Sequence, residues 1–362
     1  MEYKKINELT TVVTGGTPST RKNEYWDNGD IPWLQSGCCQ NCDVDSTEKY
    51  ITKEGYNNSS THMMSADTVM IALTGATAGK VGYLKFEACG NQSITGILPC
   101  ESLNQRYLFF YLLSQREKIL ADCVGGAQAH ISQSYVKNMT IPILAIKEQE
   151  QIVGELTKVS NIVSLRQEEI QQLDNLVKAR FVEMFGDCTN MISLSELCLI
   201  ITDGTHQSPK FQHDGIPFIL VSNLSKNTVT YDTDKFISAE TYKELYKRTP
   251  IEIGDILLST VGSYGHPAVV VEDRKFLFQR HIAYLKPKSD ILNSYYMHGA
   301  LLSPGCQRQI EEKVKGIAQK TLNLSEIRKI RIPVPSLDLQ KQYADFVHQV
   351  NKSKFDTMTF AP

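Results

Sequence analysis

The chain has 362 residues, of which 41% are hydrophobic and 22% charged, and its formal net charge is −2. This length suffices for two domains with separate cores, and the composition excludes a disordered or low-complexity protein. No run of about 20 apolar residues is present, and the charged start lacks the apolar segment of a secretory signal. The nine cysteines, an odd number, favour a reducing compartment. We therefore expect a cytoplasmic protein without a membrane partner.

The first 146 residues predict a mixed α/β domain. GDIPWLQ (residues 29–35) is typical of a strand entered through a proline turn, and DTVMIALTGATAGKV (67–81) of an apolar strand that leads into a glycine-rich turn. RYLFFYLLSQREKIL (106–120) has the apolar spacing of a short buried helix. SQSYVKNMTIPIL (132–144) predicts a capped short helix followed by a strand that contains a proline.

The glycine-rich turn resembles a phosphate-binding loop but is incomplete. A P-loop follows G-x-x-x-x-G-K-[ST], because successive N–H groups, the lysine and a Mg-binding hydroxyl must converge on one phosphate chain. Here the spacing from Gly75 to Gly79 is one residue short, and Val81 stands where the hydroxyl is needed. An enzyme that binds a nucleotide at Gly75 to Lys80 is therefore an alternative, but the residues favour a recognition loop.

Residues 147–185 contain no proline and predict one long central helix. A heptad seam runs from Ile152 to Met184, and its members are apolar except for Arg166 and Arg180. This is a coiled-coil pattern, which as a single helix would extend roughly 58 Å. The alternative is a long helix packed on its own domain.

The second half of the chain repeats the first. INELTTVVTGGT (6–17) aligns without a gap with LSELCLIITDGT (194–205), and NQRYLFFYLLS (104–114) with NSYYMHGALLS (293–303). Residues 125–151 align with 316–342 at a constant offset. Identical pairs include Gly16 with Gly204 and Gln149 with Gln340. Three collinear blocks indicate two copies of one module.

The predicted organisation is therefore two similar domains, each followed by a helix. The first domain spans 1–146, the central spacer helix 147–186, the second domain 187–337 and a truncated C-terminal helix 338–362. Tyr343, Val347 and Val350 continue the seam until Lys354 interrupts it. Paired antiparallel, this short helix would cover only the end of the central helix. We expect another chain to cover the remaining seam residues, which are Ile152, Leu156, Val159 and Val163.

Several motifs together match a known family. They are GGAQAHISQSYVKNMTIPIL with the following EQEQIV, its second copy GIAQKTLNLSEIRKIRIPVPSLDLQKQ, the strand GDILLSTVGSYG, and LVKARFVEMFGD at the end of the central helix. They resemble the Gly-x-x-Gln loop, the I-P-[ILV]-P element, the E-Q-x-x-I helix start and the G-D-[IL]-L strand of type I restriction–modification DNA specificity subunits. Each motif is weak, but the combination is specific and covers nearly the whole chain.

The resemblance implies two target-recognition domains held apart by antiparallel helices. Each domain would read one half of a bipartite sequence in double-stranded DNA, and the helices would set the spacer. Two modification subunits would dock and methylate adenine N6 with S-adenosylmethionine, and restriction subunits using ATP and Mg would join some complexes. The specificity subunit itself would be no enzyme and would bind no cofactor.

Two other classes of function stay open. The sequence contains no [ND]PP[YF] motif, no dinucleotide fingerprint, no complete Walker A motif and no HExxH, which agrees with a binding subunit. A stand-alone DNA-binding or scaffold protein without a methyltransferase is one alternative. The nucleotide-binding enzyme described above is the other.

By analogy with the family, three contact loops in each domain are the candidate DNA contacts. Gln and Asn pair with adenine, and Arg and Lys with guanine or phosphate, although a turn or surface role is the equal alternative for each residue. The first contact loops contain Thr17, Ser19, Arg21 and Lys22, and in the second copy Thr205, His206, Gln207 and Lys210. The second contact loops contain Thr77 and Lys80, and Ser263, Tyr264 and His266. The third contact loops contain Gln128, His130 and Ser132, and Gln319, Lys320 and Asn323.

Two further sequence segments could bind a ligand, one a metal ion and the other a polyanion. CCQNC (38–42) contains half of a zinc site, but no second pair follows at finger spacing, so we expect no metal. Residues 308–331 hold seven basic and three acidic side chains, which is either a polyanion contact or a solvated basic face.

Overall fold

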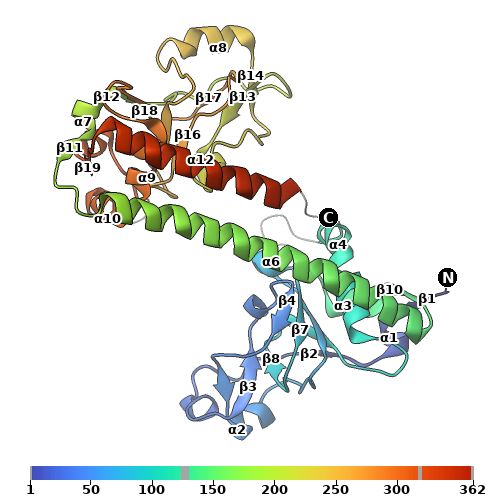
Figure 1. Ribbon diagram of the computed structural model, residues 1–362. Helices are drawn as coiled ribbons and strands as arrows, with labels where there is room; N and C mark the ends of the chain where they lie inside the picture. Colours follow the sequence, from blue (N-terminus) through green and yellow to red (C-terminus); the bar gives the residue numbers. More distant parts are fainter. Residues whose placement is uncertain (1, 124–129, 317–319, 360–362) are drawn as a thin grey trace. The chain divides into compact units, whose positions relative to one another are not determined.

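The computed structural model describes residues 2–123, 130–316 and 320–359 (Figure 1). The chain divides into two compact units, Met1–Ile162 and Val163–Pro362. The boundary falls within the longest helix, α6 (Ile146–Phe185). No helix in the described ranges is long and apolar enough to cross a bilayer.

The first unit is built on a five-stranded sheet with the strand order β2-β9-β6-β7-β4. Its core lies between this sheet and α3, where Leu108 and Leu112 are fully buried. A three-stranded sheet, β5-β3-β8, and the pair β1-β10 complete the unit. The strands are β1 (Glu2–Lys5), β2 (Val12–Thr14), β3 (Ile31–Leu34), β4 (Cys42–Val44), β5 (Tyr50–Ile51), β6 (Val69–Ala72), β7 (Val81–Leu84), β8 (Cys89–Gly90), β9 (Ile94–Ile97) and β10 (Thr140–Ile143). The helices are α1 (Ile6–Leu9), α2 (Lys53–Asn57), α3 (Gln105–Ser114), α4 (Arg116–Ala121) and α5 (Gln133–Asn138), with 3-10 turns η1 (Asn23–Tyr25), η2 (Ser36–Cys38) and η3 (Gly75–Thr77).

The second unit has a four-stranded sheet, β12-β18-β15-β16, a three-stranded sheet, β14-β13-β17, and the pair β11-β19. Its main core includes Tyr296 and Met297 of α9, both fully buried. The strands are β11 (Met191–Ser193), β12 (Cys198–Asp203), β13 (Ile216–Ile219), β14 (Phe236–Ile237), β15 (Ile256–Ser259), β16 (Pro267–Val269), β17 (Leu277–Phe278), β18 (Ile282–Pro287) and β19 (Arg331–Pro333). The helices are α7 (Leu194–Leu197), α8 (Ala239–Tyr246), α9 (Ser294–Leu302), α10 (Pro304–Lys313), α11 (Leu324–Ile327) and α12 (Leu337–Thr359), with one 3-10 turn, η4 (Val221–Leu224).

Strand pairing confirms that the chain contains two copies of one module. The strand order β2-β9-β6-β7 of the first unit recurs as β12-β18-β15-β16, and β5-β3-β8 recurs as β14-β13-β17. Even the parallel pair is repeated, with Trp33 opposite Cys89 in one unit and Phe218 opposite Leu277 in the other. The mixed α/β fold with a long central helix is therefore as expected.

The structure pairs the glycines that precede the first contact loops of the two units differently from the gapless sequence alignment. Gly15 donates its N–H to Ile94, and Gly204 donates to Ile282, so the structure pairs Gly204 with Gly15 rather than with Gly16. The shift arises because β12 contains a bulge near its start, which adds one residue. A Cβ would lie 2.1 Å from a carbonyl oxygen at Gly15 and 2.2 Å at Gly204, so only glycine fits either position.

Two segments are each divided in the structure. In the apolar segment of residues 214–224, the strand β13 ends at Ile219 and the chain continues as the turn η4. The reason is the nearly buried Asn223, whose Oδ1 accepts the Leu220 N–H at 2.9 Å and whose Nδ2 donates to the Asp232 carbonyl at 2.8 Å. The predicted helix at 106–120 is divided at Gln115 into α3 and α4.

Within the second unit, α12 packs antiparallel to the C-terminal half of α6 (Figure 1). Tyr343 contacts Phe181 with ring centroids 5.4 Å apart, and further along α12 Lys354 pairs with Asp174 at 2.5 Å. Lys354 therefore extends the pairing of the two helices instead of ending it. α12 has 23 residues, whereas α6 has 40.

Candidate nucleic-acid interface

The three contact loops of the first unit meet along one edge of its main sheet. Thr17 donates its hydroxyl to the Gln92 side chain at 2.5 Å, which attaches the first contact loop to the segment before β9. Leu73, where the second contact loop begins, donates its N–H to Ser93 at 2.8 Å. Leu73 also accepts the N–H of Ile131, in the third contact loop, at 2.9 Å. Residues 92–93 thus join the first and second contact loops, and Leu73 joins the second to the third.

The second unit repeats this arrangement with different side chains. Thr205 donates its N–H to Phe278 at 3.0 Å, as Gly16 donates to Gly90 at 2.8 Å, and Thr205 also forms a parallel bridge with Gln279. Thr260 donates its N–H to His281 at 2.9 Å and accepts the N–H of Leu322 at 2.8 Å. The same backbone scaffold therefore presents two different sets of side chains.

In the first contact loop of the first unit, the predicted DNA-contact residues differ in whether their side chains form hydrogen bonds or ion pairs within the protein. Ser19 and Arg21 are exposed, and Arg21 makes no hydrogen bond or ion pair with the described residues. Lys22 donates to the Tyr25 hydroxyl at 2.9 Å and lies 3.6 Å from Glu24, and the contact with Tyr25 raises the pKa of Lys22. Arg21 is therefore the more available cation of this loop.

In the first contact loop of the second unit, the His206 side chain contacts an aspartate of the same unit. Its ring lies 3.0 Å from Asp203, whose carboxylate also pairs with Arg248 at 2.6 Å. Gln207 and Lys210 are exposed and make no hydrogen bond or ion pair within the described parts of the chain. These two side chains are free to contact a ligand.

The second contact loop is the turn of a β-hairpin in both units, β6–β7 and β15–β16. A P-loop instead joins a strand to a helix, whose N-terminus holds the phosphates. The Lys80 ammonium donates to Gln40 Oε1 at 2.6 Å. The loop therefore gives no support to the nucleotide-binding alternative.

Thr77, the other predicted residue of this loop, donates its hydroxyl to the Thr74 carbonyl at 3.3 Å, within the turn itself.

The third contact loop is partly outside the described residues, because Gln128 and Gln319 fall there. His130 is exposed and its backbone bridges Thr74. Ser132 caps α5, since its hydroxyl accepts the Tyr135 N–H at 3.0 Å, so this oxygen has a structural role. In the second unit Lys320 lies over the Tyr264 ring, 5.9 Å from its centroid. Ser263 is exposed in the hairpin turn, and Asn323 is the N-cap residue that precedes α11.

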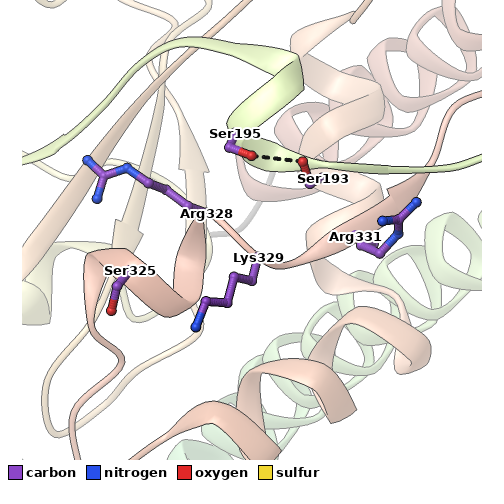
Figure 2. A pocket seen from close by; sticks show the side chains of 6 residues that line it. All are labelled: Ser193, Ser195, Ser325, Arg328, Lys329 and Arg331. Atoms are coloured by element: carbon purple, nitrogen blue, oxygen red, sulfur yellow. Dashed lines mark hydrogen bonds between the residues drawn. The ribbon is translucent and has the colours of Figure 1, made fainter.

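The basic sequence window contributes to a shallow pocket of about 550 Å³ in the second unit (Figure 2). Arg328, Lys329 and Arg331 surround it. Arg328 donates to the Ile201 carbonyl at 2.7 Å, and Lys329 pairs with Glu326 at 3.1 Å. The remaining lining residues are Ser193, Ser195 and Ser325. We call this the basic pocket.

The corresponding corner of the first unit also carries basic side chains, with Lys137 at the position of Arg328 and Lys5 at the position of Ser193. Its pocket, of about 360 Å³, has Asn138 and Thr140 at the positions of Lys329 and Arg331, and its Lys118 is accompanied by Asp122. The lining of this pocket therefore carries less positive charge than that of the basic pocket.

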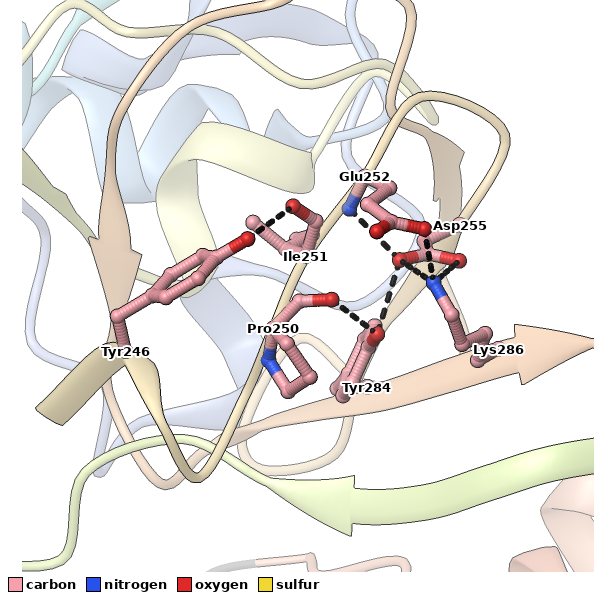
Figure 3. Close-up of polar contacts among 7 residues, drawn as sticks. All are labelled: Tyr246, Pro250, Ile251, Glu252, Asp255, Tyr284 and Lys286. Carbon is pink, nitrogen blue, oxygen red and sulfur yellow. Dashed lines mark hydrogen bonds and ion pairs between the residues drawn. The ribbon is translucent and has the colours of Figure 1, made fainter.

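The aspartate of the G-D-[IL]-L strand is part of a structural network (Figure 3). Asp255 accepts the Tyr284 hydroxyl at 2.9 Å and the Lys286 ammonium at 3.2 Å. Burial raises the pKa of Asp255 despite these partners, and raises the pKa of Tyr284 as well. In the first unit Asp67 accepts the Tyr83 hydroxyl at 3.0 Å, and burial raises the pKa of Tyr83 to about 12. Both aspartates support the strand that leads into the hairpin.

The exposed seam on α6 is shorter than expected. Leu156, Val159 and Val163 are 39%, 41% and 39% exposed. Ile152 differs, because it packs against the core of the first unit. We define the α6 seam as Leu156, Val159 and Val163, which lie on one face of the helix at i, i+3 and i+7.

Sequence reasoning missed two side chains beside the contact loops, Gln40 and Asn227. Gln40 lies in the CCQNC segment, whose cysteine spacing masks the role of the glutamine, and Asn227 follows η4 in a polar turn. All nine cysteines are free thiols. Within the described ranges, no three His, Cys, Asp or Glu side chains are placed to hold a metal ion.

Comparison with known proteins gives consistent matches. Residues 1–175 and 189–359 each match the family model described as type I restriction modification DNA specificity domain. The chain is 32% identical over 169 residues to the specificity subunit of the type I restriction enzyme EcoR124I/EcoR124II of Escherichia coli. That match covers 45% of this chain and 42% of that protein, so it spans less than half of the relative.

Two other matches extend over nearly the whole chain. The type I restriction enzyme MjaIX specificity subunit of Methanocaldococcus jannaschii is 23% identical, over 96% of this chain and 85% of that protein. The solved S subunit of a type I restriction–modification system from M. genitalium is similar at 16% identity and a TM-score of 0.52. That structural match covers 99% of this chain and 91% of the other, and it supports the fold.

Proposed function

The chain belongs to the type I restriction–modification DNA specificity family, and from this premise we propose that it is the non-catalytic, sequence-reading subunit of a type I complex. Each unit reads one half of a bipartite target in double-stranded DNA. The observation that carries this proposal is the convergence of three contact loops at the same sheet edge in both units. Sequence readers need polar side chains on loops held by a rigid scaffold.

The two half-sites have different sequences, because the equivalent loops carry different side chains. Arg21 and Lys22 in the first unit are suited to contact guanine or phosphate. In the corresponding loop of the second unit, Gln207 is suited to contact adenine and Lys210 to contact guanine or phosphate. The basic pocket contacts a phosphate of the DNA backbone, for which guanidinium, ammonium and hydroxyl donors are suited.

The proposed partners supply the chemistry. Two modification subunits bind S-adenosylmethionine and methylate adenine N6, and restriction subunits, where present, bind ATP and Mg. The chain itself needs no cofactor. The two helices set the length of the spacer between the half-sites.

The α6 seam is the proposed docking site of a modification subunit. Three apolar side chains, each about two-fifths exposed, lie on the part of α6 that precedes its pairing with α12. Leu156→Asp should therefore lower the yield of the complex with the modification subunit in size-exclusion chromatography, without lowering the stability of the isolated chain. Self-association that Leu156→Asp abolishes would assign the seam to a second copy instead. Unchanged assembly in both experiments would disprove docking at this face.

The test of the function is a genome-wide map of N6-methyladenine in a methylation-free host. The chain is co-expressed with the modification subunit encoded beside it, and each protein is expressed alone as a control. A split, asymmetric motif that appears only with both proteins supports the proposal. Exchange of residues 1–146 for those of a relative should then change one half of the motif. Absence of methylation, with both proteins soluble and associated, would contradict it.

A further inference from the structure

The two hairpin turns place Lys80 and His266 at the same position. The Ala72 N–H donates to the Lys80 carbonyl at 2.9 Å, and the Ser259 N–H donates to the His266 carbonyl at 3.1 Å. The preceding residue is a glycine in both turns, in the left-handed region with φ of 73° and 80°. The second turn is one residue shorter, so the aligned sequences do not reveal this equivalence.

Each of these side chains is held by an amide from the same neighbouring segment. Lys80 Nζ donates to Gln40 Oε1 at 2.6 Å, and His266 Nδ1 lies 3.1 Å from Asn227 Oδ1. Gln40 follows β3 and η2, and Asn227 follows β13 and η4, which are the corresponding elements of the two units. Because an amide oxygen only accepts, His266 Nδ1 carries the proton of this bond.

The segments that carry the two amides are themselves fixed. Asn41, next to Gln40, has a φ of 63° and exchanges two hydrogen bonds with Val81, at 2.8 and 3.0 Å. Asn227 has a φ of 57°, and its carbonyl accepts the Nε2–H of His298 at 3.0 Å. A left-handed asparagine costs backbone energy, which persists only where the surroundings determine it. The backbone that carries the Gln40 and Asn227 side-chain amides is therefore preorganised to hold Lys80 and His266.

We propose, on the basis of the function proposed above, that Lys80 and His266 each read one base edge in the major groove. Lys80 retains two N–H donors beyond its bond to Gln40 and selects guanine, whose edge offers the O6 and N7 acceptors. His266, with its proton on Nδ1, presents Nε2 as an acceptor and selects the exocyclic amine of adenine or cytosine. Gln40 and Asn227 are positioning residues.

The test is selection from a randomised duplex library by the full chain in complex with its modification subunit. The variants are Lys80→Met, which removes the donors at similar length, and His266→Phe, which removes the acceptor. Each should reduce discrimination at one base pair of one half-site by roughly tenfold while the rest of the motif is retained. Gln40→Leu and Asn227→Leu should relax the same base pairs to a smaller extent. Lys80→Arg should preserve the preference for guanine.

The controls separate base reading from other roles. Lys53→Met removes an exposed cation of α2 and should leave the motif unchanged. A uniform loss of affinity after Lys80→Met, with every base preference intact, would show a phosphate contact and overturn the inference. An unaltered motif with all four variants would overturn it as well. If the wild-type complex selected no sequence, the proposed function itself would fail.

Discussion

The buried side-chain oxygen of Gln149 accepts the backbone N–H of Asn104 at 2.8 Å. Its amide group donates to the Leu144 carbonyl at 2.9 Å, so the first turn of α6 is tied to the residue that caps α3. Gln340 makes the matching contact with Asn293 at 2.8 Å, at the start of α12. This contact explains why a glutamine recurs at both positions.

Replacement of Gln149 by leucine should lower the free energy of unfolding by about 1–3 kcal/mol, because the Asn104 N–H would be left buried without a partner. Gln340→Leu should have a similar effect in the second unit. Urea denaturation of the full chain measures both. The matched controls are Gln151→Leu and Gln342→Leu, at exposed positions on the same helices. Equal effects at buried and exposed positions would refute the assigned role.

Removal of charge from the basic pocket should weaken DNA binding without changing its specificity. In the triple variant Arg328→Gln, Lys329→Gln and Arg331→Gln, each lost phosphate contact should reduce the slope of log affinity against log salt concentration by about 0.9. Fluorescence anisotropy with target and unrelated duplexes at several salt concentrations measures this. Lys118→Gln, in the neutral pocket of the first unit, is the control. An unchanged slope would place DNA elsewhere.

Stability should fall as the pH drops below about 6.5, in part because of His298. Its Nε2–H donates to the Asn227 and Pro267 carbonyls, and burial lowers its pKa, with a smaller effect of Lys354 in the same direction. The unfolded chain then binds a proton that the folded chain does not, so the free energy of unfolding rises with pH in this window. The loss between pH 7.5 and 5.5 should be smaller in His298→Asn. An equal loss in both proteins would contradict this assignment.

The aromatic contact between α12 and α6 should be a main source of stability in the second unit. Tyr343 is 1% exposed, and its ring lies 5.4 Å from Phe181 and 5.7 Å from Phe185. Tyr343→Ala should cost about 3–5 kcal/mol, as for other buried aromatic side chains. Gly299→Ala should also destabilise, because a Cβ there would lie 2.4 Å from the Tyr343 hydroxyl.

Calorimetry of the full chain measures both effects. Gln349→Ala, at an exposed position of α12, should change stability by no more than about 0.5 kcal/mol. If Tyr343→Ala were as mild as this control, the pairing of α12 with α6 would not contribute to the stability of the unit.

Local sequence patterns were sufficient to predict the two repeated modules and the central helix. The collinear blocks are visible in the sequence because the same contacts, such as those of Gln149 and Gln340, are needed twice. The heptad spacing predicts α6 because helical periodicity depends on residues three and four apart. The sequence predicts the three contact loops of each unit as DNA contacts, but it did not predict the hydrogen bond that Ser132 accepts from Tyr135 or the contact of His206 with Asp203.

The sequence by itself determined the two-module organisation, the long helix and the segments that form the contact loops, since these depend on local spacing and on repetition. Only the tertiary structure decided which side chains correspond between the modules. One bulge in β12 shifts the glycine pairing, and one residue fewer in the second hairpin hides the match of Lys80 with His266. The partners Gln40 and Asn227 are 40 and 39 residues away along the chain. Such contacts are set by strand pairing between distant segments, which no local pattern records.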